Sequence, residues 1–370
     1  MRKIIYLALV AATTFVGIQS CKKSSNDQAA GSTFDRKGLL TNISTNIIIP
    51  AYTAFQTTTV SLDAAVTTFN TTANAAHLVA LQIAFQDTYK QWESTSIFEF
   101  GPTATATLRV STNTYPTDVN QINANIAAGT YNPQLLANLA AKGLPAMDYL
   151  LFGTGADNTS ILAQYTTASD AAKRKNYLSV LSAELKTNAT TVATAWATYK
   201  TTFISADGTD VSSSVGQLLN QLVYDYEILK NFEIGIPAGT QSLGTVYPQK
   251  VQAYYSKMSV QLAILHIQAI QNIYLGKSSA GDGLGFDNYL ISANAKYSDG
   301  TSLNDAIKAQ FATSLAKLQT LSDPLSDNIT NNKTAVIAAY TELQKLTVLL
   351  KTDVTSSLGI LITYGDNDGD

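Results

Sequence analysis

Cysteine and histidine are almost absent from this sequence, which has one Cys and two His in 370 residues. A single Cys cannot form an intramolecular disulfide and cannot supply a cysteine-rich zinc site. The two histidines, His77 and His266, are too few for a metal site built from histidine alone. The sequence has no Glu-x-x-His or His-Glu-x-x-His pattern, which excludes a metallopeptidase of the latter type.

Charged residues are also scarce, at 14% of the sequence against about 25% in an average globular protein. Lys and Arg number 24 and Asp and Glu number 27, for a net charge of −3. This balance excludes a broadly basic surface, so we expect no nucleic acid partner. Hydrophobic residues reach 45%, which is enough for a buried core and excludes global disorder. Uncharged polar residues replace the missing charges, as suits the surface of an exported protein.

The N-terminus has the pattern of a lipoprotein signal. A basic pair precedes an apolar stretch over residues 4–16, which is too short to span a membrane. The single Cys, Cys21, lies where cleavage would occur, although Gln19 before it is bulkier than usual. We expect residues 1–20 to be a lipoprotein signal peptide, Cys21 to carry lipid, and residues 21–33 to form a flexible tether. An ordinary secreted protein with a chance Cys is the alternative.

The body of the chain has the apolar periodicity of amphipathic α-helices, with buried-type residues every three or four positions. The clearest stretches cover residues 78–96, 178–203 and 251–273. Counting between Gly- and Pro-rich breaks gives about eight main helices, and long helices with short connections pack as antiparallel bundles. We therefore predict an all-α fold of two tandem helical bundles, an N-terminal one over residues 34–206 and a C-terminal one over residues 207–370.

Four segments form an ordered set of motifs along the chain. They are residues 92–102 (WESTSIFEFGP), residues 143–153 (GLPAMDYLLFG), residues 233–237 (EIGIP) followed by 251–256 (VQAYYS), and residues 358–364 (LGILITY) running into an acidic end. In this order and spacing they resemble the imelysin family, which carries the label peptidase M75 and includes iron-regulated protein A. The resemblance implies an exported all-α protein of two bundles, often a lipoprotein, associated with iron uptake.

The second segment departs from the family's Gly-x-His-x-x-Glu motif. Gly143 is kept, Pro145 stands in place of the His, and Asp148 stands in place of the Glu. A His and a Glu three residues apart on a helix share a face and could bind one metal ion. Pro145 cannot ligate through its side chain, whereas Asp148 keeps a carboxylate. The resemblance therefore leaves Asp148 as the candidate metal ligand and argues against an active peptidase.

Further candidates are acidic, aromatic or histidine residues near these motifs. The ligand-binding or motif residues we single out are Gly143, Pro145, Asp148, Trp92, Glu93, Glu99 and Glu233. The glutamates, together with Glu227, could line a cleft between the bundles or lie on the solvated surface. His266 lies in a strongly apolar stretch, which favours a satisfied core or groove histidine, and His77, near the start of a helix, suits a solvated or capping role. Asp366, Asp368 and Asp370 begin a calcium-loop pattern that is left unfinished, so an acidic tail is the simpler interpretation.

The leading hypothesis is a lipid-anchored envelope protein, at the outer membrane and facing the periplasm or the surface, that binds iron or another divalent metal, or an iron-containing ligand. Its expected partners are the membrane, through the lipid, and an outer-membrane iron transporter. One alternative is a metal-dependent peptidase, for which Pro145 is an obstacle. The other is a nutrient-binding lipoprotein of the SusD type, which is helical with a similar N-terminus but usually longer.

Overall fold

Helices make up most of the computed structural model, which describes residues 34–364. The predicted all-α fold class is confirmed: within this range the only strands are β1 (Lys277–Ser278) and β2 (Gly281–Asp282), which form one short antiparallel pair. No helix between residues 34 and 364 is both long and apolar enough to cross a membrane. The predicted signal peptide, Cys21, the tether and the acidic end at Asp366, Asp368 and Asp370 lie outside the described residues.

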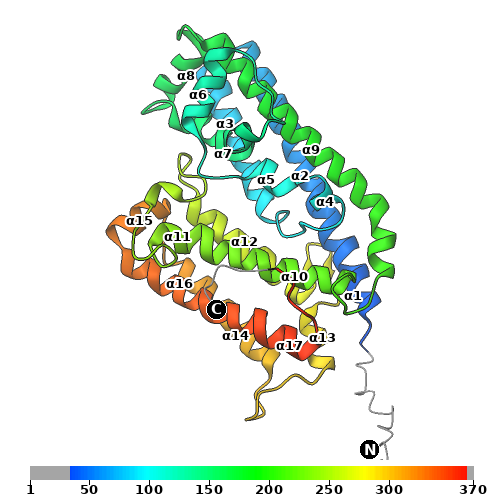
Figure 1. Cartoon of the computed structure of the whole chain (residues 1–370). Helices are drawn as coiled ribbons and strands as arrows, with labels where there is room; N and C mark the ends of the chain where they lie inside the picture. The colour runs from blue at the N-terminus through cyan, green and yellow to red at the C-terminus, as the bar shows by residue number, and fades with distance from the viewer. Residues whose placement is uncertain (1–33, 365–370) are drawn as a thin grey trace, which may run out of the picture. The chain divides into compact units, whose positions relative to one another are not determined.

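One group of helices packs around α2 (Ile49–Thr71), which contacts both α3 (Ala75–Glu93) and α9 (Ala171–Ser205) (Figure 1). The group also contains α1 (Arg36–Asn42), α4 (Pro102–Thr105), α5 (Leu108–Thr112), α6 (Val119–Ala128), α7 (Gly143–Asp148) and α8 (Asn158–Thr166). His77 lies in the first turn of α3, as predicted, but the capping residue is Asn74, whose side chain accepts the His77 backbone N–H at 2.9 Å.

A second group of helices follows α9. It comprises α10 (Ser214–Glu227), α11 (Ile236–Ala238), α12 (Ser259–Leu275), α13 (Phe286–Ser292), α14 (Leu303–Leu318), α15 (Leu325–Asn331), α16 (Lys333–Val348) and α17 (Thr355–Leu358). In this group α14 contacts both α12 and α16. The two groups meet where α12 contacts α3. The described residues from Phe34 onward form one compact unit, and the predicted boundary at residue 206 or 207 falls in the connection between α9 and α10, where it stays a prediction.

Four helical segments among the described residues have the wider π-helical turn. They are η1 (Ile43–Ile48), η3 (Tyr149–Gly153), η4 (Ile228–Gly235) and η6 (Leu349–Val354), while η2 (Leu136–Ala141) and η5 (Pro248–Lys250) are 3₁₀ turns. Each π segment continues directly from the α-helix before it. Such segments are rare and occur often at functional sites, because the extra residue in the turn shifts which side chains share a face.

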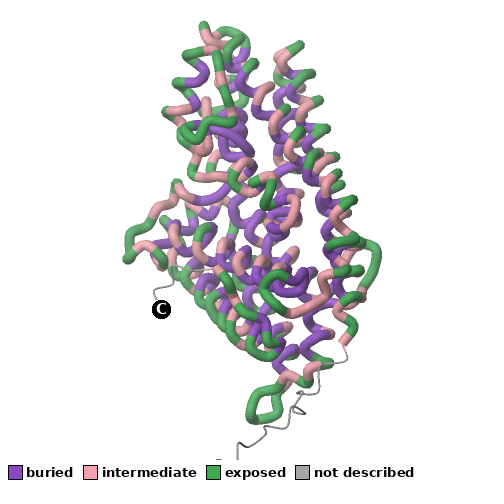
Figure 2. The backbone as a smooth tube through the Cα atoms, turned by 45° about the vertical axis from the view of Figure 1, so that its right-hand side comes forward, coloured by how far each residue is buried: buried purple, intermediate pink, exposed green. Residues whose placement is uncertain are grey.

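The predicted apolar stripes form most of the core, but the stretch over residues 251–273 is helical only from Ser259, where α12 begins. Before it the chain turns, because Ala253 and Lys257 have positive φ, which an α-helix does not allow, and Tyr254 is exposed. Leu78, Leu81, Phe85, Tyr89 and Trp92 of α3 are all buried, and buried residues run along the inner sides of the helices (Figure 2). Trp92 packs against Phe55 of α2 with ring centroids 5.4 Å apart. Within this apolar interior, a small number of acidic and basic side chains are also buried, and these define the candidate site.

Candidate metal centre

Three buried side chains from distant parts of the sequence converge at the contact between the two helix groups. Glu93 is the last residue of α3, Glu233 lies on η4, and His266 lies in the middle of α12. One potential ligand atom from each lies within 4.8 Å of the other two, which makes them the one group of the described residues suited to hold a metal ion. The His266 Nδ1 atom lies 2.8 Å from Glu233 Oε1 and 3.6 Å from Glu93 Oε2.

The π-helical turn of η4 explains how Glu233 comes to face this cluster. Glu233 follows Asp225 of α10 by eight positions, which would separate them by about 80° around an uninterrupted α-helix. The wider turn of η4 lies between them and takes up one additional residue, so that their spacing corresponds to about two full turns. Asp225 and Glu233 therefore project from one face, and both contact His266.

Asp225 lies on the far side of the His266 ring from the two glutamates. Its Oδ2 atom is 2.5 Å from His266 Nε2 and also accepts a hydrogen bond of 3.3 Å from the Ser96 hydroxyl. Its Oδ1 atom accepts a hydrogen bond of 2.7 Å from Arg109 Nη2, and the same Nη2 atom donates to the Ser96 carbonyl. Asp225 is therefore paired with a fixed cation and can hold the imidazole in one orientation.

Two buried oxygen atoms at the cluster have no hydrogen-bond partner among the described residues. They are Glu233 Oε2 and Gln252 Oε1. Gln252 reaches the cluster from the segment before α12, and its Nε2 donates to Glu93 Oε1 at 2.6 Å. A buried acceptor without a partner costs free energy. Both oxygens are thus acceptors that a bound cation would satisfy.

Burial and charge together set the protonation of the cluster. Burial, reinforced by the negative charge of Glu233, raises the pKa of Glu93 well above its usual range. Burial opposes ionisation of Asp225, but the neighbouring charges of His266 and Arg109 lower its pKa. Burial likewise works against a charged His266, yet Asp225 and Glu233 raise its pKa well above the usual value. Without metal, protons on Glu93 and His266 therefore balance the charge at this site.

The distances fit a transition metal ion. Histidine nitrogen and carboxylate oxygen bind such ions at about 2.0–2.2 Å, which places adjacent ligand atoms about 3 Å apart. The two separations from His266 Nδ1, 2.8 Å to Glu233 and 3.6 Å to Glu93, span this value. One imidazole and two carboxylates are a donor set that suits divalent iron, zinc or manganese. The hydrogen bond from the second ring nitrogen to Asp225 is the usual companion of a metal-binding histidine.

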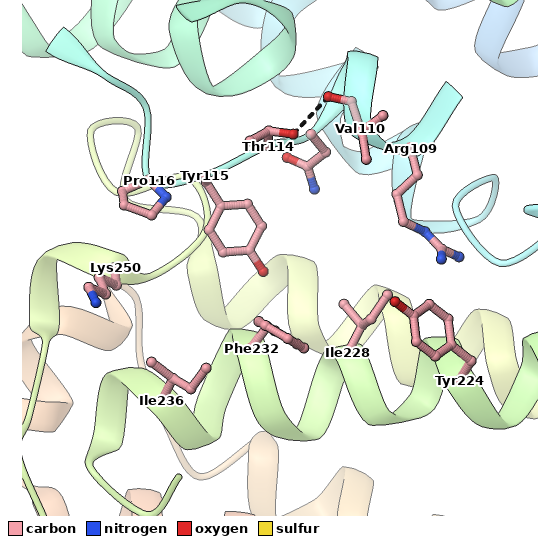
Figure 3. Close-up of a pocket in the computed structure, with 11 residues that line it drawn as sticks. Arg109, Val110, Thr114, Tyr115, Pro116, Tyr224, Ile228, Phe232, Ile236 and Lys250 are labelled. Carbon is pink, nitrogen blue, oxygen red and sulfur yellow. Dashed lines mark hydrogen bonds between the residues drawn. The ribbon is translucent and has the colours of Figure 1, made fainter. Parts of the chain in front are cut away.

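The cluster borders two adjoining cavities. A small inner cavity of about 50 Å³ is lined by all three candidate ligands together with Trp92. A larger outer pocket of about 370 Å³ lies beside it (Figure 3). Both are lined by Arg109, Asn113, Tyr115 and Ile228. The inner cavity that contains the centre therefore adjoins the outer pocket, and these four residues line both.

Asp148 is not part of the cluster of Glu93, Glu233 and His266, and its carboxylate accepts backbone hydrogen bonds instead. Its Oδ2 and Oδ1 atoms accept the backbone N–H groups of Tyr255 and Ser256, each at 2.9 Å. Burial raises the pKa of Asp148 to about 6 in spite of these hydrogen bonds. The contacts support a structural role, in which Asp148 ties α7 to the segment before α12, and its role as a metal ligand stays a prediction.

The other residues of that motif also contact protein. Gly143 has a φ of +68°, and a Cβ there would lie 2.3 Å from the Thr112 carbonyl oxygen, so only glycine fits. Pro145 is buried in the first turn of α7 and lines, with Asp148, a small cavity of about 30 Å³. These observations explain the Gly and Pro by packing.

The surface interpretation of the glutamates is wrong for three of the four. Glu93, Glu227 and Glu233 are buried, and Glu227 Oε1 lies 2.9 Å from Lys351 Nζ. Glu99 is half-buried and accepts the backbone N–H of Arg109 at 3.3 Å. Burial raises the pKa of Glu99 to about 7. Of the predicted site residues, Trp92, Glu93 and Glu233 are brought together at the cluster.

Sequence reasoning did not single out four contributors to this site: His266 as a candidate ligand, Asp225, Arg109 and Gln252. The prediction that His266 is a satisfied core histidine is confirmed, and its hydrogen-bond partners are the carboxylates of Glu233 and Asp225. The sequence did contain a sign of the role of Asp225. Only 14% of the residues are charged, and Asp225 lies inside an apolar helix. A buried acid needs a charged or hydrogen-bonding partner.

The comparison with known families agrees with this fold. The imelysin family model, labelled peptidase M75, matches residues 48–350, which is most of the chain. The protein therefore belongs to the imelysin family.

Individual relatives are distant. The chain is 22% identical over 321 residues to iron-regulated protein A of Synechococcus elongatus, covering 83% of each chain. Its fold resembles a Parabacteroides distasonis crystal structure assigned as an iron-regulated protein A precursor, with a TM-score of 0.72, 17% identity, and coverage of 87% of this chain and 95% of that one. It also resembles an imelysin-like protein of Psychrobacter arcticus, with a TM-score of 0.67, 19% identity, and coverage of 89% and 97%.

Proposed function

We propose that this protein binds iron, as a divalent ion or within an iron-containing ligand, at Glu93, Glu233 and His266. The observation that carries the proposal is the setting of His266. Its Nε2 atom is held by Asp225, so that Nδ1 faces two buried carboxylates. A carboxylate on the far side of the ring is what fixes the orientation of metal-binding histidines in general. The name of the Synechococcus elongatus relative, iron-regulated protein A, supports iron as the cargo.

The charge of the cluster supports a cation of charge +2. When Glu93 and one nitrogen of His266 lose their protons, the carboxylates of Glu93, Asp225 and Glu233 face the single guanidinium of Arg109. The excess is then two negative charges in a buried setting, which is costly without a counter-charge. A divalent ion supplies that counter-charge and also a partner for Glu233 Oε2.

We further propose that the protein works at the cell envelope, held by lipid on Cys21. The support is the apolar signal stretch over residues 4–16, which the single Cys of the chain follows at position 21. A tethered protein with a buried metal site suits the capture and hand-over of iron outside the cytoplasm, with an outer-membrane iron transporter as the partner.

Metal content of the purified full chain tests the metal site. The protein is incubated with Fe²⁺, Fe³⁺ or Zn²⁺, desalted and measured by elemental analysis. We expect about one equivalent of iron in the unaltered chain, and a loss of about tenfold or more in affinity in Glu233→Gln and His266→Gln. His77→Gln is the matched control, because it alters the other histidine, which hydrogen-bonds to Asn74 and Thr72 at the start of its own helix. Circular dichroism confirms folding of each variant.

Two results would contradict the proposal. One is an unaltered chain that retains no metal under any of the three conditions. The other is a folded Glu233→Gln variant that retains as much metal as His77→Gln. The glutamate variant guards against loss of folding, because it keeps the size of the side chain and one of its acceptors.

A further inference from the structure

We propose that the outer pocket of about 370 Å³ binds a small organic anion with a flat apolar body, and that this anion supplies oxygen ligands to the metal at the inner cluster. The second part rests on the proposed metal site. The first part stands on the pocket itself. The pocket is lined by residues of α5 and the segment after it, facing α10 and η4 (Figure 3).

The pocket has the size and lining of a small-molecule site. Pockets that bind such molecules measure about 300–1,000 Å³ and are mostly apolar, with a few polar groups that fix orientation. Here Val110, Tyr115, Ile228, Phe232 and Ile236 supply the apolar and aromatic lining. Figure 3 shows Tyr115 descending from one side toward Phe232 and Ile228 on the other. A flat ring system would fill the space between them.

Two of these apolar side chains are exposed to an unusual degree. Phe232 is 50% exposed and Val110 is 45% exposed, and both line this one pocket. Phe232 lies on η4, one residue before Glu233, so the same π-helical segment presents an aromatic ring outward and a carboxylate inward. Exposed apolar surface concentrated at a concave site marks a place where a ligand binds.

The charges at the pocket select an anion. Arg109 lies at one end and Lys250 at the other, and no carboxylate side chain is among the described residues that line it. Arg109 stands over the Tyr224 ring at 5.4 Å, and its buried Nε atom has no hydrogen-bond partner among those residues. Lys250 Nζ lies 4.0 Å above the Tyr247 ring. Lys250 and the unpartnered Nε of Arg109 would both donate to an anionic group in the pocket.

The residues that line both cavities place an anion in the outer pocket next to the metal site. Arg109, Asn113, Tyr115 and Ile228 line both the outer pocket and the inner cavity, which contains Glu93, Glu233 and His266. An anion seated in the outer pocket lies next to the centre. A ferric ion at that centre would leave one uncompensated positive charge, since the cluster offers an excess of two negative charges. An anionic oxygen from the outer pocket would balance it.

Salicylate is the probe, because it is a flat aromatic acid with two adjacent oxygen donors. Titration calorimetry with the metal-free full chain measures its affinity, and salicylamide serves as the neutral analogue of the same shape. We expect salicylate to bind about tenfold more tightly than salicylamide, because of Arg109 and Lys250.

Variants of the pocket test which residues bind the probe. We expect Phe232→Ala to weaken the binding of salicylate about tenfold. We expect Lys250→Gln to weaken the binding of salicylate but not that of salicylamide. Leu243→Ala, at a fully exposed apolar residue outside the pocket, is the matched control.

The outcomes separate this inference from the proposed function. Equal binding of salicylate and salicylamide, or no difference between Phe232→Ala and Leu243→Ala, would overturn the anion pocket even where the protein retains iron. Salicylate binding without any iron retention would leave the pocket in place and remove the metal centre. When both are present, we expect ferric iron and salicylate together to give a visible charge-transfer band that Phe232→Ala weakens. Absence of that band with both bound would overturn the shared coordination.

Discussion

The Nε2 atom of His266 lies 2.5 Å from Oδ2 of Asp225, although 41 positions separate the two residues in the sequence. Asp225 is in turn paired with Arg109 at 2.7 Å. This chain of a buried imidazole, a buried carboxylate and a partly exposed guanidinium joins α12, α10 and α5. It therefore contributes both to the stability of the contact between the helix groups and to the orientation of a candidate metal ligand.

Replacing Asp225 by Asn should affect stability and metal binding together. The variant leaves Arg109 without its ionic partner, and loss of one member of a buried pair costs about 3–5 kcal/mol. It also weakens the hold on His266, so we expect iron affinity to fall about 10- to 100-fold. Denaturant unfolding and metal titration measure the two effects. Asp87→Asn is the control, because Asp87 pairs with Lys90 on the surface, where such pairs contribute about 0.2–1 kcal/mol. Equal losses in the two variants would contradict the role of Asp225.

Without metal, the Glu93→Gln variant should become more stable than the unaltered protein as the pH rises. Because the pKa of Glu93 is raised in the folded state, the folded protein holds a proton there that the unfolded chain has released. Stability from this group is present at low pH and is lost as the pH rises from the unfolded pKa toward the folded one, by about 1.4 kcal/mol per pH unit. Glu93→Gln has no such loss, and it should also abolish metal retention.

The measurement for Glu93 is the midpoint of urea unfolding from pH 4 to 8 for both proteins. The unaltered chain should lose stability relative to the variant as the pH increases. Parallel curves for the two proteins would show that burial does not hold a proton on Glu93.

Metal binding should release protons and therefore strengthen as the pH rises. The pKa of His266 is raised well above its usual value because Asp225 and Glu233 outweigh burial, and a metal binds only the neutral ring. Each proton displaced should make the affinity about tenfold higher per pH unit. Calorimetry in two buffers with different ionisation enthalpies counts the protons. An affinity independent of pH between 6 and 8 would place the metal elsewhere.

Replacing Asp148 by Asn separates a structural role from a ligand role. Asn offers one acceptor oxygen to the two backbone N–H groups of Tyr255 and Ser256. One donor is left unsatisfied, which costs about 1–3 kcal/mol. At pH 4, where the raised pKa does not yet penalise the carboxyl, we expect a lower melting temperature, and at pH 7 we expect unchanged iron retention. Loss of iron with unchanged stability would instead identify Asp148 as the ligand.

Asp148→Asn should also change how the thermal stability of the protein depends on pH. Burial raises the pKa of Asp148 to about 6, so the folded state favours the protonated carboxyl. The stability this provides is present below the unfolded pKa and is lost as the pH rises through about 6. Asp148→Asn should remove this step from the melting profile between pH 4 and 7.

Replacing Cys21 by Ser should release the protein from membranes without unfolding it. The motive is the single Cys at the end of an apolar signal stretch. Detergent-free fractionation followed by immunodetection compares the two proteins, and circular dichroism checks their helicity. A variant that stays in the membrane pellet would remove the lipid anchor.

The helical class of this protein could be predicted because local patterns carry it. The stripe from Leu78 to Trp92 repeats at the helical period and is buried as expected. The position of His77 at the start of a helix was also predicted from the sequence, and it lies in the first turn of α3, which Asn74 caps. Glu93 and Glu233 were candidates because they lie in segments that resemble the imelysin family, and they lie at the cluster.

The sequence by itself determined the all-α class and the family, since amphipathic periodicity and ordered motifs are local properties of the chain. Only the tertiary structure decided that Glu93, Glu233 and His266 meet, because they come from three elements far apart in sequence. The π-helical turn of η4 could not be predicted either, because the pattern used to find helices assumes 3.6 residues per turn throughout. It shifts Glu233 onto the face of Asp225, and a shift of one residue in a helix decides which side chains reach a buried site.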